Sequence, residues 1–152
     1  MTTRQLSAVM FADIQGYTAL MQENEWDAMI IRNKFQEVLE NACKTHNGRI
    51  AELSGDGALC IFSSDIEAVY AAISIQKEMI AKPKVPLRIG IHSGDILFHG
   101  DKIYGNGVNV ASRIESFAVA GSVFMSGIVF NEIKNQKDIE AVSLGEYFLK
   151  NV

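Results

Sequence analysis

The residues from Phe11 to Thr18 could bind a metal ion or a phosphate. Asp13 ends an apolar, strand-like run, and Gly16 precedes a stretch with helical spacing. Free backbone N–H groups at the start of a helix can bind phosphate, and a carboxylate at that point can hold a divalent cation. Aspartate is also a common helix cap. Taken alone, the motif therefore predicts either a metal ligand or a simple cap.

A second carboxylate, Asp56, lies in the sequence Ser-Gly-Asp-Gly between two β-prone runs, residues 49–53 and 58–62. This spacing predicts a hairpin with a tight glycine turn and Asp56 at its tip. In a β-α-β-β unit the hairpin lies beside the end of the first strand, so Asp13 and Asp56 can converge on shared metal ions. Two carboxylates suit Mg²⁺ bound to substrate phosphates. A lone Gly-Asp-Gly is more often only a turn.

A third motif, Asn-Val-Ala-Ser-Arg at residues 109–113, places an amide and a guanidinium on one helix face. Arginine is a permanent, forked charge that suits a phosphate oxyanion. The alternative is a solvated helix face or a surface ion pair. The spacing alone leaves both interpretations open.

Hydrophobic spacing predicts the elements that carry these motifs. We expect a strand at residues 6–11, strands at 49–53 and 58–62, and a strand at 87–92 after Pro83 and Pro86. The first helix should bury a set of apolar side chains at three- and four-residue intervals, namely Trp26, Met29, Ile30, Phe35, Val38, Leu39 and Ala42. A second helix runs from Ser64 through Ile80. The order β-α-β-β-α-β is the ferredoxin-like unit, with both helices on one face of an antiparallel sheet.

The rest of the chain continues this pattern. We expect a helix through Val108 and Ile114, a strand at 122–125, a short helix at 128–133 and a terminal pair of strands ending at Phe148-Leu149. The predicted fold class is therefore α+β, a ferredoxin-like βαββαβ core with a C-terminal αβαββ extension. We assign residues 1–152 to a single domain.

Composition excludes several classes of protein. With 14 Lys and Arg against 18 Asp and Glu, the net charge is −4, and no basic cluster could follow a nucleic-acid backbone. No apolar run approaches the roughly 20 residues of a membrane span. The 2 Cys, Cys43 and Cys60, fall in a helical and a strand-like run, which favours reduced core thiols. We expect a cytoplasmic domain that binds no nucleic acid and has no membrane span in this segment.

Five segments, taken in order, narrow the interpretation. They are Phe-Ala-Asp-Ile-x-Gly-Tyr-Thr at 11–18, Glu-x-x-Gly-Asp at 52–56, Arg-Ile-Gly-Ile-His-Ser-Gly at 88–94, Tyr-Gly-Asn-x-Val-Asn-Val-Ala-Ser-Arg at 104–113 and Leu-Lys at 149–150. Together they resemble the class III nucleotidyl cyclases, the adenylate and guanylate cyclase catalytic domain, over nearly the whole chain. The resemblance implies an enzyme of signal transduction that makes a 3′,5′-cyclic nucleotide and pyrophosphate from a purine nucleoside triphosphate.

The resemblance also implies a role for each motif. Asp13, Asp56 and the backbone carbonyl of Ile14 would bind two Mg²⁺ or Mn²⁺ ions per site. Asn109 would orient the ribose, and Arg113 would stabilise charge on the α-phosphoryl oxygens.

Three further positions would bind phosphate groups by the same resemblance: Gly16, Tyr17 and Lys150. In this family the sites lie between two subunits arranged head to tail, with the carboxylates of one facing the Asn and Arg of the other. A homodimer would therefore hold two sites.

Two positions depart from the usual family patterns at the base pocket. Glu52 agrees with guanylate-forming members, whereas Lys102 matches neither the adenylate- nor the guanylate-forming pattern. Either the two side chains read the base, or they pair with each other across a tolerant pocket. Base reading would favour GTP over ATP.

Other departures bear on assembly. The chain between His92 and Tyr104 is shorter than in the mammalian relatives, so the arm that braces their dimers is largely missing, and Asn151 replaces the usual glycine after Lys150. We expect this domain to be cut from a longer, regulated chain. The alternative function is a weak or inactive cyclase-homology domain that signals by binding nucleotide or a partner. A cyclic dinucleotide synthase lacks support, because there is no Gly-Gly-Asp/Glu hairpin motif.

Overall fold

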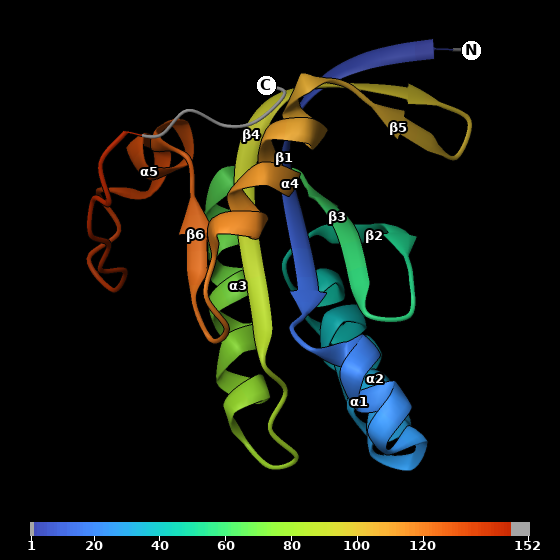
Figure 1. The fold of residues 1–152 in the computed structure, drawn as a ribbon. Helices are drawn as coiled ribbons and strands as arrows, with labels where there is room; N and C mark the ends of the chain where they lie inside the picture. The colour runs from blue at the N-terminus through green and yellow to red at the C-terminus, as the bar shows by residue number, and fades with distance from the viewer. Residues whose placement is uncertain (1, 147–152) are drawn as a thin grey trace.

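The computed structural model describes residues 2–146, which form one sheet with helices on both of its faces (Figure 1). In chain order the elements are β1 (Thr2–Ile14), α1 (Tyr17–Glu23), α2 (Glu25–Thr45), β2 (Gly48–Leu53), β3 (Gly57–Phe62), α3 (Asp65–Ile80), β4 (Leu87–His99), β5 (Lys102–Tyr104), α4 (Asn106–Phe117), β6 (Val123–Met125) and α5 (Gly127–Ile133). The predicted α+β class is confirmed.

The sheet has the strand order β2-β3-β1-β4-β5, and β6 also pairs with β4. β1 is a central strand, antiparallel to β3 on one side and to β4 on the other, whereas β6 runs parallel to β4. In this register Asp13 lies opposite Gly57 on β3 and opposite Arg88 on β4. Two residues that are far apart in the sequence are thus placed on either side of Asp13.

Side chains that alternate along β1 separate two apolar clusters. Ala8, Met10, Ala12 and Ile14 pack with residues of α2 and α3, and Val9 packs on the opposite face with Ala111 of α4. α2 and α3 therefore cover one face of the sheet and α4 lies on the other, as Figure 1 shows. This arrangement fixes α4 above the strands that carry Asp13 and Arg88.

The first predicted helix is broken. The chain turns at Asn24, whose side chain accepts a hydrogen bond from the backbone N–H of Asp27 and caps α2. The prediction that Trp26, Met29 and Ile30 are buried is wrong: they are 67%, 42% and 36% exposed. The apolar periodicity of α2 that faces the core begins at Ala28 and continues through Phe35 and Leu39.

The strand prediction differs in three places. β1 runs from Thr2 to Ile14, beyond both ends of the strand predicted at residues 6–11. β4 continues past His92 to His99 and forms a short hairpin with β5. The predicted terminal pair of strands is absent from residues 134–146, where Val142 and Leu144 are exposed, and Phe148-Leu149 lie outside the described residues.

Two further observations concern the described part of the chain. Cys43 and Cys60 are buried free thiols, as the sequence predicts. No helix within residues 2–146 is both long and apolar enough to cross a membrane.

Candidate active site

Asp13 and Asp56 converge at one end of the sheet. Asp13 is the next-to-last residue of β1, and the Ile14 N–H that follows it donates a 2.7 Å hydrogen bond to the carbonyl of Asp56. Gly57 pairs with Asp13 across the strands, and a Cβ at Gly57 would lie only 3.7 Å from Asp13 Oδ1. The predicted neighbourhood of the two carboxylate residues is therefore present within one chain.

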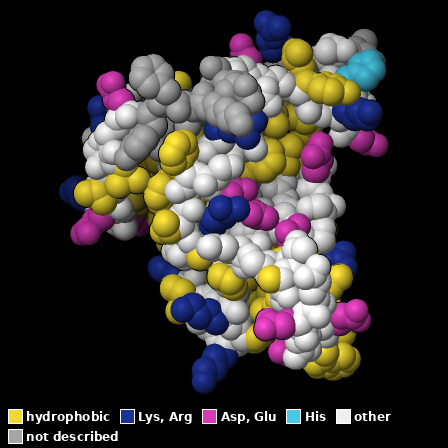
Figure 2. Space-filling view, viewed as in Figure 1, with side chains coloured by type: hydrophobic (Ala, Val, Ile, Leu, Met, Phe, Trp, Pro, Cys, Tyr) yellow, Lys and Arg dark blue, Asp and Glu magenta, His cyan; other side chains and the backbone are white. Residues whose placement is uncertain are grey.

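Arg88 reaches the same place from β4. Its Nη2 donates a 2.7 Å hydrogen bond to Asp13 Oδ2, which raises the pKa of the guanidinium further above its ordinary value. The two side chains are only 28% and 25% exposed, so solvent screens the pair incompletely. Figure 2 shows acidic and basic side chains meeting in the middle of this face of the molecule.

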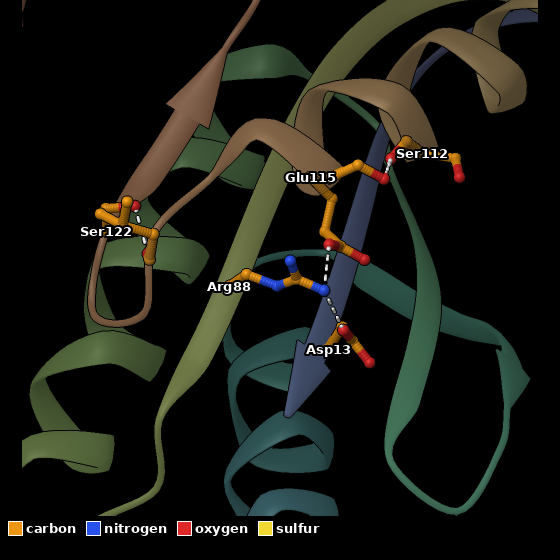
Figure 3. A network of polar contacts seen from close by, with 7 residues as sticks. Asp13, Arg88, Ser112, Glu115 and Ser122 are labelled. Atoms are coloured by element: carbon orange, nitrogen blue, oxygen red, sulfur yellow. Dashed lines mark hydrogen bonds and ion pairs between the residues drawn. The ribbon is translucent and has the colours of Figure 1, made fainter. Parts of the chain in front are cut away.

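Glu115 approaches Arg88 from α4. Its Oε2 lies 3.4 Å from the same Nη2 atom, and the side chain is 12% exposed (Figure 3). Burial, followed by repulsion from Asp13, raises the pKa of Glu115 to about 7, and repulsion from Asp56 adds to this rise. The Arg88 guanidinium thus lies between two carboxylates, those of Asp13 and Glu115.

The chemistry of the donor set fits a divalent cation that is shared with substrate phosphates. Asp13, Asp56 and the backbone offer hard oxygen ligands, which Mg²⁺ and Mn²⁺ prefer. No group of three or more His, Cys, Asp or Glu side chains with the geometry of a metal site occurs among residues 2–146. The protein alone therefore supplies too few ligands for a closed metal site, and bound phosphates and water would have to complete the coordination.

Asn109 and Arg113 lie on α4, as the sequence predicts, but on a different side of it from Glu115. Asn109 is exposed and Arg113 is half-buried, and neither forms a side-chain hydrogen bond or ion pair with the described residues. At about 100° per residue, Arg113 and Glu115 point in directions about 160° apart around the helix. Because Glu115 faces Asp13 of its own chain, Asn109 and Arg113 face elsewhere.

The two base-pocket candidates, Glu52 and Lys102, lie on different strands. Glu52 is exposed on β2, next to a register irregularity between Ile50 and Glu52, and Lys102 is exposed at the start of β5. No ion pair joins these two side chains, both of which are described. Among residues 2–146, neither side chain forms an ion pair that a ligand would have to break.

Two of the three phosphate-binding candidates lie within the described residues. Gly16 has a positive φ of 76° and turns the chain from β1 into α1, and Tyr17 packs against the core at the start of that helix. Lys150 lies outside the described residues.

Sequence reasoning did not single out Arg88 and Glu115 as site residues. Arg88 begins the Arg-Ile-Gly-Ile-His-Ser-Gly segment, so its place in a family-like motif is a signal that could have found it. Glu115 follows the Asn-Val-Ala-Ser-Arg motif and has the pattern of an ordinary polar residue of an amphipathic helix. Only the packing of α4 on β4 reveals its position.

Comparisons with known proteins support the resemblance that the ordered motifs indicate. The sequence profile described as "Adenylate and Guanylate cyclase catalytic domain" matches residues 2–151. The chain is 34% identical over 157 residues to "Putative adenylate cyclase 3" of Rhizobium meliloti (strain 1021), with 98% of this chain and 27% of that protein covered. It spans less than a third of the length of the first curated relatives that it matches.

Solved structures share the fold. An adenylate/guanylate cyclase/hydrolase from Silicibacter pomeroyi superposes with a TM-score of 0.90 at 31% identity, covering 100% of this chain and 93% of the other. The adenylyl cyclase CyaB from P. aeruginosa gives 0.81 at 25% identity, covering 90% and 84%. The chain belongs to the family of adenylate and guanylate cyclase catalytic domains.

Proposed function

We propose that this domain converts a purine nucleoside triphosphate into the 3′,5′-cyclic nucleotide and pyrophosphate. The observation that carries the proposal is the convergence of Asp13 and Asp56 at the end of β1, with the Arg88 guanidinium 2.7 Å from Asp13. An acidic pair beside a fixed cation suits a substrate that brings both divalent metal ions and a triphosphate. Family membership supports the same reaction.

Asp13 and Asp56, with the backbone carbonyl of Ile14, would hold two Mg²⁺ or Mn²⁺ ions. Such ions supply Lewis-acid chemistry that makes the ribose 3′-hydroxyl more acidic and offsets the charge of the triphosphate. Arg88 contributes a permanent positive charge from the protein itself, in reach of phosphate oxygens that enter beside Asp13. Gly16 and Tyr17 follow directly on this end of β1 and would lie along the phosphates.

The remaining groups would come from a second copy of the chain. Asn109 and Arg113 face away from the Asp13 of their own chain, which supports a homodimer in which α4 of one copy completes the site of the other. There Asn109 would orient the ribose by hydrogen bonding, and Arg113 would stabilise the charge that develops on the α-phosphoryl oxygens. Lys150 would contact the terminal phosphates.

Glu52 and Lys102 would read the base. Guanine presents donors at N1 and N2 and an acceptor at O6, which match a carboxylate and an ammonium. The absence of an ion pair between Glu52 and Lys102 supports this assignment over mutual pairing.

The purified chain should be incubated with ATP or GTP and Mn²⁺, with cyclic nucleotide and pyrophosphate measured over a range of protein concentrations. We expect equal amounts of the two products and a specific activity that rises with protein concentration as dimers form. Nucleotide binding without either product would instead support the inactive cyclase-homology domain.

A further inference from the structure

Glu115 reaches the site because α4 packs unusually close to β4. A Cβ built on Gly90 would clash with the Glu115 backbone N and lie 2.7 Å from its Cα, an approach that no real side chain allows. Gly90 is two residues beyond Arg88 on the same strand and so shares its face. The glycine therefore lets the backbone of Glu115 rest on β4 beside Arg88.

The contact between Glu115 and Arg88 leaves hydrogen-bonding capacity unused on both sides. Glu115 Oε2 and Arg88 Nε are both buried without a hydrogen-bond partner, although the carboxylate and the guanidinium are ion-paired at 3.4 Å. A single atom, Nη2, faces both Asp13 and Glu115 (Figure 3). After a small rotation of the guanidinium, Glu115 would accept the hydrogen bond that Arg88 now donates to Asp13.

This arrangement gives Arg88 two anionic partners, of which only Asp13 is a proposed metal ligand. Without Glu115, the guanidinium would have Asp13 as its only ion-pair partner within residues 2–146 and would compete with a cation for that carboxylate. With Glu115 in place, Arg88 can leave Asp13 without becoming an unpaired charge that is largely buried.

We infer that Glu115 is a positioning residue that shares Arg88 with Asp13 and thereby keeps the Asp13 carboxylate open to a divalent cation. This inference rests on the proposed function, because it assigns a role within the same site. It also gives α4 two roles, since the helix presents Asn109 and Arg113 to one site and holds Arg88 in the other.

The test is a double-mutant cycle read out by Mn²⁺ binding without nucleotide. Glu115→Gln should weaken Mn²⁺ binding about tenfold when Arg88 is present, but only about twofold in an Arg88→Gln background, where only the lost negative charge acts. Arg88→Gln alone should tighten binding. The matched control is Glu40→Gln, an exposed helical glutamate on α2, on the other face of the sheet, and it should leave the affinity unchanged.

Equal effects of Glu115→Gln in both backgrounds would overturn the inference, since a purely electrostatic role needs no Arg88. If Glu115→Gln does not fold, Glu115→Asp keeps the charge but withdraws the carboxylate by one methylene. It should then weaken Mn²⁺ binding only where Arg88 is present, and an effect independent of Arg88 would again contradict the inference.

Cyclase turnover of the same wild-type protein separates this inference from the proposed function. Coupled Mn²⁺ binding without cyclic nucleotide would contradict the proposed function alone. Turnover with no coupling between Glu115 and Arg88 would contradict this inference alone. A wild-type chain that binds no Mn²⁺ without nucleotide would contradict this inference alone, because in the proposed function the substrate phosphates complete the coordination.

Discussion

The two halves of the candidate site differ in how far one chain completes them. At the end of β1, Asp13, Arg88 and Glu115 are half-buried or buried and held by contacts within the chain. On the other side of α4, Asn109 and Arg113 have no side-chain partners among the described residues, Arg113 being half-buried and Asn109 exposed.

The first half of the site is assembled within one chain, whereas the side chains of the second half would need a second copy of the chain to contact them. A buried cluster of charges is costly unless its members are paired, so the fold must position these groups in advance. Asn109 and Arg113 carry no such constraint and can be positioned by a partner. The comparison therefore supports a site that is shared between two copies of the chain.

Removing a carboxylate from the preassembled half should have the largest effect. Asp13→Ala and Asp56→Ala should each lower cyclase activity ~100-fold or more. Each removes a proposed ligand of the metal ions that would stabilise negative charge in the transition state. Glu40→Ala, a carboxylate outside the site, should retain activity. Cyclic nucleotide formation with Mn²⁺ measures the effect, and full activity in Asp56→Ala would contradict the two-ion assignment.

The thermal midpoint of the Asp13 variant depends on the ion pair with Arg88. The Asp13 side chain is only 25% exposed and is ion-paired with Arg88. Asp13→Ala loses that pair and also loses repulsion toward Glu115, so these changes partly cancel. We expect a net change within about 1 kcal/mol, measurable by thermal unfolding.

The side chains at the base pocket should have a more moderate effect, which is on the preference between GTP and ATP. Glu52 and Lys102 should favour GTP over ATP by about fivefold to 150-fold in kcat/KM, which corresponds to ~1–3 kcal/mol. The double variant Glu52→Lys with Lys102→Asp should move toward ATP. Competition assays with both nucleotides measure the shift, and an ATP preference in the wild type would contradict base reading while leaving the cyclase assignment standing.

The last of these effects is the pH dependence of the free energy of unfolding. The pKa of the Glu115 carboxyl is about 7 in the folded chain, against an ordinary value of 4.5. The contribution of this group to the free energy of unfolding is therefore fully present below pH 4.5 and is lost as the pH rises through 7. The metal-free wild type should therefore lose up to about 3 kcal/mol of unfolding free energy through this group over that range. Glu115→Gln should show a shallower decline in urea unfolding at pH 5 and pH 7.5.

Glu40→Gln provides the matched control for this measurement and should follow the wild type at both pH values. A Glu115→Gln variant with the same decline as the wild type would show that Glu115 does not titrate in this range. Asp13 and Asp56 face Glu115, and Arg88 opposes their effect, so the decline belongs to the cluster as a whole.

The sequence was sufficient for the features that depend on local pattern. An apolar run predicted the middle of β1, and Gly-Asp-Gly turn chemistry predicted the β2–β3 hairpin. The β-α-β-β order predicted the approach of Asp13 to Asp56. The N-cap Ser64 and the prolines at 83 and 86 bounded α3 as expected, since capping and proline act over a few residues.

The features that depend on tertiary packing could not be predicted in this way. Trp26 has core-like spacing, but the Asn24 cap redirects the chain and leaves it exposed. Glu115 gains its role only because Gly90 admits α4 close to β4, a contact between residues 25 positions apart. Helical spacing alone gave no reason to place that carboxyl beside Arg88.

The central claim is that one site takes its carboxylates from one copy and its Asn and Arg from another. Mixing two inactive variants, Asp13→Ala and Arg113→Ala, tests it most directly. With free subunit exchange, half the dimers are mixed and one of their two sites is intact, so about a quarter of the wild-type activity should return. No recovery in verified heterodimers would place the whole site within one chain and contradict the account.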